Sequence, residues 1–310
     1  MIRPLQPTDV FRYSLLNRLE RVNRAQRLEE LVKESPNTLN AISLAKEALP
    51  VKGKSLCLVA VSKGGLTGLA SARSRAGPKC WEVAELFSSH GNEQDICELL
   101  EGLGLEAAQR DAERVFLRLL RDDPIADIAR QAGFLPCFVE FLYRGQVYLD
   151  SFGSSLPSSL RTRTAADDHS LFRLYNAATP PKVKHALGMT LEEWRDSQER
   201  FPVRCHEVVS EVNGSITCLI KTVQYRQMGQ LDIVVHPDEE SRLPDLVDYG
   251  LRRFAQGNWV AVRVADYQLS LSRLIEERGF RRMSEYDTTV KFLAMQVHEK
   301  SGVPVKATPI

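Results

Sequence analysis

The sequence predicts an α/β protein with two similar domains in tandem, each a mixed, mostly antiparallel sheet flanked by helices. Three observations favour this arrangement. The chain has 310 residues, which is long for a single hydrophobic core. The same order of strand and helix patterns occurs in both halves of the chain. Short matching segments lie in register between the halves, as expected of an internal duplication.

Two pairs of matching segments give the same spacing. HGNE begins at His90 and HPDE begins at His236, and 236 − 90 = 146. A Gly-Phe pair begins at Gly133 and another at Gly279, and 279 − 133 = 146. One offset shared by a strand end, a helix and a Gly-Phe pair indicates that both halves descend from one unit.

The boundary between the halves is expected in a serine-rich stretch. RGQVYLDSFGSSLPSSL, residues 144–160, lacks a period of 2 or 3.6, because glycine, proline and serines interrupt it. We therefore expect an N-terminal domain over residues 1–146, a linker over 147–158 and a C-terminal domain over 159–297. The polar end of the chain, residues 298–310, is expected to be a flexible tail.

The first half begins with a short strand in IRPLQPTDV and a long helix in FRYSLLNRLERVNRAQRLEELVK, with an acidic residue capping the helix. SLCLVAV and LTGLASARS are expected to form a hairpin around Lys63-Gly64-Gly65. The remaining order is a strand, a helix, a strand, a helix and a strand, in WEVAELFSS, QDICELLEGLGLEAAQRDA, RVFLRLL, PIADIARQAGF and LPCFVEFLYR.

The second half repeats this order. LRTRTAADD leads into the helix HSLFRLYNAA, and three strands follow in HEVVSEV, ITCLIKTVQYR and QLDIVV. A helix is expected from about Ser241 to Gln256. The half ends with a strand, a helix and a strand, in WVAVRVA, LSLSRLIEERGF and SEYDTTVKFLAM.

Composition and charge narrow the class of protein. The chain has 41 basic and 40 acidic side chains, so no overall field favours nucleic acid or an anionic membrane as a partner. No apolar run has the length of a membrane span, and the first residues lack the apolar segment of a signal peptide. The six cysteines are scattered without a Cys-x-x-Cys pair. They indicate free thiols in a cytoplasmic protein and no metal site.

The order of strand, helices, three antiparallel strands, helix, strand, helix and strand resembles the GNAT superfamily of acyl-CoA N-acyltransferases. The segments that carry the resemblance are IRPLQPTDV, RVFLRLL with PIADIARQAGF, and the VVHP corner that ends at Pro237. The resemblance covers nearly the whole chain, once in each half. It implies acyl transfer from acetyl-CoA to an amine on a small molecule or a peptide.

In that family the fourth strand pairs its backbone with the pantetheine arm, and the following turn holds the pyrophosphate. In the second half the resemblance places the pantetheine on Leu231, Ile233 and Val235. Arg242 is the nearby base for the phosphates. The family's turn reads Arg/Gln-x-x-Gly-x-Gly/Ala, but here Glu240, Leu243 and Asp245 occupy the Arg/Gln and the two glycine positions.

Acidic residues around this turn leave a second interpretation open. Residues 238–248 contain five acids and one base. Each close contact between like charges costs on the order of 1 kcal/mol in water, which opposes an anionic coenzyme. Acids at a helix start also stabilise the helix itself. The chain is therefore either an N-acetyltransferase or an inactive protein of the same fold that binds another ligand, a protein partner or a second copy of itself.

The first predicted helix carries a basic stripe. Arginines recur every three residues at Arg18, Arg21, Arg24 and Arg27. Glutamates interrupt the stripe, so it favours a solvated or partner-facing surface over a nucleic-acid site.

Three residues are candidates for proton transfer. The family often has a proton-donating tyrosine four residues before the glycine of Gly-Phe, but Ala129 and Ile275 stand there. Tyr267, just past the strand WVAVRVA, is a candidate acid from a neighbouring position; the alternative is a packing residue. A carboxylate on the fourth strand often serves the family as general base for the amine, and Glu85 and Asp232 hold that position in the two halves. The alternative for both carboxylates is an outward polar residue on a half-buried strand.

Overall fold

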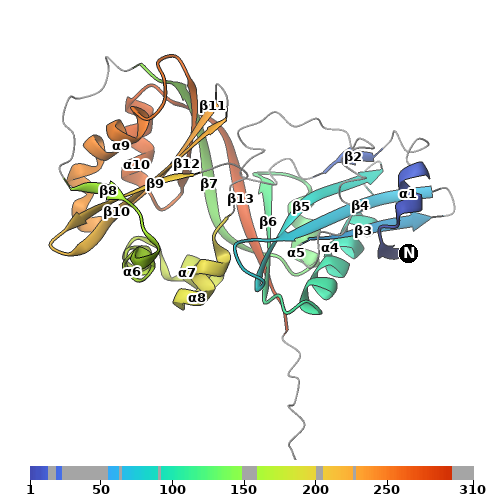
Figure 1. Ribbon diagram of the computed structural model, residues 1–310. Helices are drawn as coiled ribbons and strands as arrows, with labels where there is room; N and C mark the ends of the chain where they lie inside the picture. Colours follow the sequence, from blue (N-terminus) through green and yellow to red (C-terminus); the bar gives the residue numbers. More distant parts are fainter. Residues whose placement is uncertain are drawn as a thin grey trace, which may run out of the picture.

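The computed structural model describes residues 1–12, 19–22, 55–62, 65–89, 92–148, 159–199, 205–225 and 228–294. Its strands form one continuous sheet with helices packed against it (Figure 1). The strand order is β1-β3-β4-β5-β6-β13-β7-β12-β11-β10-β9-β8, with β2 added beside β5. Neighbouring strands are antiparallel except for β5 with β6 and β11 with β12. The mixed, mostly antiparallel sheet that the sequence predicts is therefore confirmed.

The first half supplies the elements up to the middle of this sheet. They are β1 (Ile2–Pro4), α1 (Pro7–Arg12), β2 (Leu19–Arg21), β3 (Ser55–Ser62), β4 (Gly65–Ser74), β5 (Cys80–Ser89), α4 (Glu93–Ala108), β6 (Arg114–Leu120), α5 (Ile125–Gln131) and β7 (Leu135–Gln146). Helix α4 buries an apolar face of isoleucine and leucine side chains against the meander β3-β4-β5. This contact gives the first half its main core.

The second half repeats the order. Its elements are β8 (Leu160–Thr162), η3 (Ala165–Asp167), α6 (Asp168–Ala178), α7 (Pro181–Leu187), α8 (Leu191–Ser197), β9 (His206–Val212), β10 (Ser215–Tyr225), β11 (Met228–Val235), η4 (Pro237–Arg242), α9 (Leu243–Leu251), β12 (Trp259–Ala265), α10 (Leu269–Glu277) and β13 (Arg281–Phe292). The short helices α7 and α8 have no counterpart among the elements expected from the sequence.

Each half starts around the same ion pair. Arg3 donates from both terminal nitrogens to Asp9, at 2.7 Å each, and Arg161 donates to Asp167 at 2.8 Å each. In both halves the carboxylate also accepts from a backbone N–H three residues earlier, at 2.9 Å and 2.7 Å. Bidentate pairing fixes the direction of the first helix relative to the first strand. It is the structural counterpart of the repeat read from the sequence.

The prediction of a long helix over residues 11–33 is wrong at residues 19–21. Leu19–Arg21 forms strand β2, antiparallel to Phe87–Ser89 of β5. Strands β5 and β6 pair only over Cys80–Glu82, so the following edge of β5 has free backbone groups. Those groups favour a strand there, because pairing satisfies them. The rest of the expected helix, including Arg18, Arg24 and Arg27, lies outside the described residues.

The final strands of the two halves are exchanged. Strand β7 pairs with β12 and β13 of the second half, and β13 pairs with β6 and β7 of the first half. The green β7 and the red β13 run side by side through the centre of the molecule (Figure 1). The two sequence halves therefore share one sheet, although the domain limits at 1–146 and 159–297 stay a prediction about sequence units.

Strand β7 is anchored in the core of the second half. The ring of Tyr143 is fully buried there, and its hydroxyl lies 2.6 Å from Ser272 Oγ and donates to Glu276 Oε1 at 2.9 Å, both on α10. At Gly145 an added Cβ would lie 2.7 Å from the ring of Phe280. A glycine is needed at this point because the backbone of β7 approaches that ring so closely.

All six cysteines lie in the described part of the chain and form no disulfide there, and Cys80, Cys137 and Cys218 are buried. Among the described helices, none is long and apolar enough to cross a membrane.

Candidate functional site

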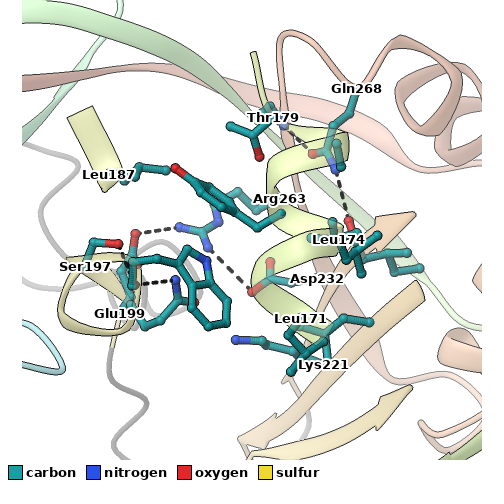
Figure 2. Close-up of a pocket in the computed structure, with 18 of the residues that line it drawn as sticks. Leu171, Leu174, Thr179, Leu187, Ser197, Glu199, Lys221, Asp232, Arg263 and Gln268 are labelled. Atoms are coloured by element: carbon teal, nitrogen blue, oxygen red, sulfur yellow. Dashed lines mark hydrogen bonds and ion pairs between the residues drawn. The ribbon is translucent and has the colours of Figure 1, made fainter. Parts of the chain in front are cut away.

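A cavity opens where β11 and β12 separate. The two parallel strands pair from Met228 to Leu231, and the pairing stops there. A space of about 210 Å³ begins beyond this point, lined by β11 from Asp232 to Val234, by the end of β12 and by helices α6 to α8 (Figure 2). Ligands commonly bind where neighbouring parallel strands diverge.

One side of the cavity carries the carboxylates Glu140, Glu199 and Asp232, which we call the carboxylate floor. Arg263 on β12 joins them. Its Nη1 lies 2.9 Å from Glu199 and 3.0 Å from Glu140, and its Nη2 lies 3.6 Å from Asp232 Oδ2 (Figure 2). Three acids can share this space because the guanidinium compensates part of their charge.

These charged groups shift one another's pKa values. Burial disfavours the ionised form of Asp232 more than Arg263 favours it, so the pKa of Asp232 lies above its ordinary value. Burial also opposes ionisation of Glu140 and Glu199, but their guanidinium partners outweigh it and both pKa values lie below the ordinary value. Near neutral pH, Asp232 is therefore the floor carboxylate best suited to take up a proton.

The other side of the cavity is the apolar wall. Helices α6, α7 and α8 supply most of it, with strands β7 and β10 completing it, through Phe138, Leu171, Leu174, Tyr175, Leu187, Trp194 and Leu219. The rings of Tyr175 and Trp194 lie 6.0 Å apart. The cavity is thus charged on one side and apolar on the other.

Tyr267 also lines the cavity. Its ring meets Phe138 edge-on at 6.2 Å. Burial, and then the charge of Glu140, raise the pKa of the phenol above its ordinary range, so the hydroxyl keeps its proton at neutral pH. The structure therefore brings two sequence-derived candidates, Asp232 and Tyr267, to one cavity.

The first half of the chain completes this site. Glu140 comes from the exchanged strand β7, and Arg118 on β6 donates to Glu140 Oε2 and to Glu199 Oε1 at 2.6 Å each. Thr288 on β13 donates to the same oxygen of Glu140 at 2.5 Å. The floor is therefore held by residues of both halves.

The third catalytic candidate, Glu85, lies elsewhere. It is on β5, where its Oε2 accepts from Arg21 of strand β2 at 2.5 Å. Strand β2 occupies the edge of β5 that corresponds to the open edge of β11. Within the described residues, the first half thus has this edge covered by its own chain.

The turn after β11 holds its polar groups to one another. Arg242 donates to Glu239 at 3.1 Å and to Ser159 Oγ at 2.8 Å. Glu240 accepts from Ser270 Oγ at 2.9 Å, which links the turn to the start of α10. Leu243, at the position of the family's first glycine, is buried in the core. These contacts hold the turn to itself, to Ser159 before β8 and to α10.

The backbone candidates on β11 differ in availability. Leu231 lies in the part of β11 that pairs with β12, whereas Ile233 and Val235 lie beyond it. The carbonyl oxygen of Ile233 already accepts from Gln268 Nε2 at 3.0 Å. A ligand that pairs with β11 would compete with this side chain.

Helix α8, which carries part of the apolar wall, is tied to β6 by a carboxylate. Glu193 accepts from Arg114 at 2.6 Å and from the backbone of Met189 and Thr190 at 3.0 Å each. Burial opposes the charge of Glu193, but these donors outweigh it and lower its pKa to about 2.

We expect Glu193→Gln to lower the free energy of unfolding at pH 7 by about 1–2 kcal/mol, less than the full pKa shift would give, because solvent screens the partly exposed carboxylate. A lowered carboxyl pKa adds stability that is complete above the unfolded value and disappears as pH falls through about 2. The difference between variant and wild type should therefore shrink below about pH 4. Urea unfolding across this range measures it, with Glu192→Gln on the exposed face of α8 as control; a gap that does not vary with pH contradicts the assignment.

Sequence reasoning missed two of the three floor carboxylates and the residues of the apolar wall. Glu199 follows helix α8, whose TLEEW start is a capping signal: Thr190 Oγ1 accepts from the backbone N–H of Glu193 at 3.2 Å. That signal could have revealed α8. Glu140 reads as an outward residue of a strand, and only the pairing of β7 with β12 and β13 brings it to the cavity.

The sheet with its open parallel edge defines the class: the chain has the GNAT fold in tandem. A GCN5-related N-acetyltransferase from Sphaerobacter thermophilus is 16% identical, with a TM-score of 0.51 over 94% of this chain and 95% of that one. A tandem GNAT protein from the clavulanic acid biosynthesis pathway is 12% identical, with a TM-score of 0.52 over 96% and 99%. The N-myristoyltransferase of Saccharomyces cerevisiae, solved with bound myristoyl-CoA, is 11% identical, with a TM-score of 0.50 over 96% and 80%.

No protein-family model and no curated protein matches the sequence. At identities of 11% to 16%, the structural likeness establishes the fold.

Proposed function

We propose that the cavity beside β11 is the catalytic site of an N-acyltransferase that uses an acyl-CoA, with acetyl-CoA the first donor to consider. The observation that carries the proposal is that Asp232 and Tyr267 both line the cavity at the open end of β11. The neighbours of the same fold are named as N-acetyltransferases and an N-myristoyltransferase, which supports the reaction class.

Asp232 acts as the general base in this proposal. An amine attacks a thioester carbonyl only through its free electron pair, so a proton must leave the nitrogen. The raised pKa of Asp232 brings its basicity closer to what this transfer needs at neutral pH. Tyr267 keeps its proton and is the hydrogen-bond and proton donor on the same cavity.

The residues around the cavity suit the pantetheine arm of an acyl-CoA better than its phosphates. An acyl-CoA supplies the activated acyl group. Strand β11 does not pair with β12 beyond Leu231, which suits the extended pantetheine arm once Gln268 leaves the carbonyl oxygen of Ile233. The turn suits the phosphates less, because Glu240 is bonded to Ser270 and Arg242 is bonded to Glu239 and Ser159. We therefore expect most of the binding energy to come from the pantetheine and acyl parts.

The test combines binding and turnover. Acetyl-CoA is titrated into the full chain by calorimetry, and thiol release is then measured with a panel of primary amines. We expect amine-dependent release that falls by about 10²–10⁴-fold in Asp232→Asn, since general-base catalysis contributes that much. Wild-type rates should fall as pH drops through the raised pKa of Asp232, because only the ionised carboxylate accepts a proton.

The exposed pair of Asp127 with Arg130 supplies the control, and Asp127→Asn should leave both rate and binding unchanged. In the same titration, Arg242→Ala should weaken binding tenfold or more if Arg242 leaves its present partners for phosphate; a smaller change removes Arg242 from the site. The absence of heat, of thermal stabilisation and of thiol release at millimolar acetyl-CoA contradicts the proposed function. The chain would then be a binding protein of the same fold.

A further inference from the structure

The free hydrogen-bonding capacity of the cavity lies in its carboxylates. Asp232 Oδ1 and Glu199 Oε2 are buried and have no hydrogen-bond partner. Each belongs to a side chain that lines the cavity, and the other oxygen of each carboxylate is already close to Arg263 (Figure 2). A buried carboxylate oxygen without a donor is costly, so a ligand that supplies N–H donors is favoured there.

The basic groups of the cavity are, by contrast, already compensated. Arg263 lies within ion-pair distance of Glu140, Glu199 and Asp232. Lys221 lies 3.3 Å from Glu207, and Arg75 lies 3.3 Å from Glu82 while its guanidinium stacks on Phe116. A ligand therefore meets unused acceptors in this cavity and bases that already have partners.

The apolar wall limits how many charges a ligand can carry. It faces the carboxylate floor across a space of about 210 Å³. A second charge placed against leucine and aromatic side chains would lose its hydration without a partner. The wall instead suits an apolar body with one polar end.

We propose that the acceptor is a small amphipathic primary amine, with its amino group between Asp232 and Glu199 and its aromatic or aliphatic body against the apolar wall. The inference rests on the proposed function for the ligand's role as acceptor, but the binding that it describes needs no acyl donor. Glu199 stays ionised because Arg118 and Arg263 overcome its burial, so it holds an ammonium group. Asp232 then faces the same nitrogen as the base.

The experiment is calorimetry on the full chain without any acyl donor, with tryptamine as the probe. Tryptophol, which replaces the amine by a hydroxyl, tests the charge, and putrescine, a diamine without an apolar body, tests the wall. We expect tryptamine to bind at least tenfold more tightly than either compound. Equal binding of tryptamine and tryptophol overturns the role of the carboxylates, and equal binding of putrescine overturns the role of the wall.

Variants assign the contacts. Glu199→Gln and Asp232→Asn should each weaken tryptamine binding tenfold or more and leave tryptophol binding unchanged. Glu192→Gln, exposed on the same helix as Trp194, is the matched control and should change neither. If Glu199→Gln does not fold, Asp232→Asn and the comparison of the three ligands on the wild type still test whether the carboxylates bind the amino group.

Failures of the two proposals are distinguishable. Tryptamine binding without any acyl-CoA binding or thiol release contradicts the proposed function and keeps this inference. Thiol release that depends on other acceptors, with no tryptamine binding, contradicts this inference and keeps the proposed function.

Discussion

Residues 159–310 produced without residues 1–148 will not form a cooperative fold. In the intact chain β7 lies between β12 and β13 and pairs with both. The fragment lacks β7, so β12 keeps a free edge in the centre of a sheet and the core loses the buried ring of Tyr143. Removing a buried aromatic ring alone costs about 3–5 kcal/mol, a large share of the stability of an ordinary domain.

The measurement compares three preparations by near-UV circular dichroism and urea unfolding. The fragment 159–310 alone should lack a cooperative transition, and the fragment 1–148 alone should as well, because it lacks β13 beside β6. The two fragments produced together should assemble and regain the transition of the intact chain. A single fragment that unfolds cooperatively and binds tryptamine would falsify the structural role of the exchanged strands.

Arg118→Met will be the most destabilising single substitution among the residues that hold the carboxylate floor. Arg118 is 4% exposed and holds Glu140 and Glu199 at 2.6 Å each. Its loss leaves Glu140 with Arg263, and Glu199 with Arg263 and the more distant Arg75 at 3.7 Å. Breaking a buried ion pair from one side costs about 3–5 kcal/mol. Urea unfolding at pH 7 should show this loss.

The pH dependence of this loss identifies its cause. Without Arg118 the pKa values of Glu140 and Glu199 rise, since the largest attraction that keeps them low is gone. Protonation then removes the unpaired charge, so the deficit of the variant should narrow as pH falls from 7 toward 5. Arg130→Met, which removes an exposed pair with Asp127, should cost no more than about 1 kcal/mol at either pH. A loss of stability of the same size in both variants contradicts the role of Arg118 in compensating Glu140 and Glu199.

The order of elements could be predicted from the sequence because it depends on local patterns. Alternating strands such as WVAVRVA and helix ends such as Gly133 and Gly279, both at positive φ, carry their own signals. Strand β2 could not be predicted, since LER lies within a sequence pattern typical of a helix and becomes a strand only against the edge of β5. The exchange of β7 and β13 also depends on partners that no local pattern names.

Only the part of the candidate site that follows from position along the chain could be predicted. Asp232 was found because the resemblance assigns its position on the fourth strand, and Tyr267 because it lies just past the strand WVAVRVA. Glu140 and Glu199 were not found, because they reach the cavity through the exchanged strand and through a short helix. The role of Arg242 stays a prediction, since its present contacts with Glu239 and Ser159 neither hold nor exclude a phosphate.

The exchange of final strands limits which mutations each half of the chain can accumulate. When two copies of a unit are independent, one copy can accumulate mutations without harm to the other. Here β7 of the first half pairs with β12 and β13 of the second half, and β13 of the second half pairs with β6 and β7 of the first half. The first half can thus lose its own open edge to β2 and still be retained by selection, because it supplies β7 and Glu140 to the second. Selection should therefore act against mutations in β7 because they affect the cavity beside β11, which belongs to the second half.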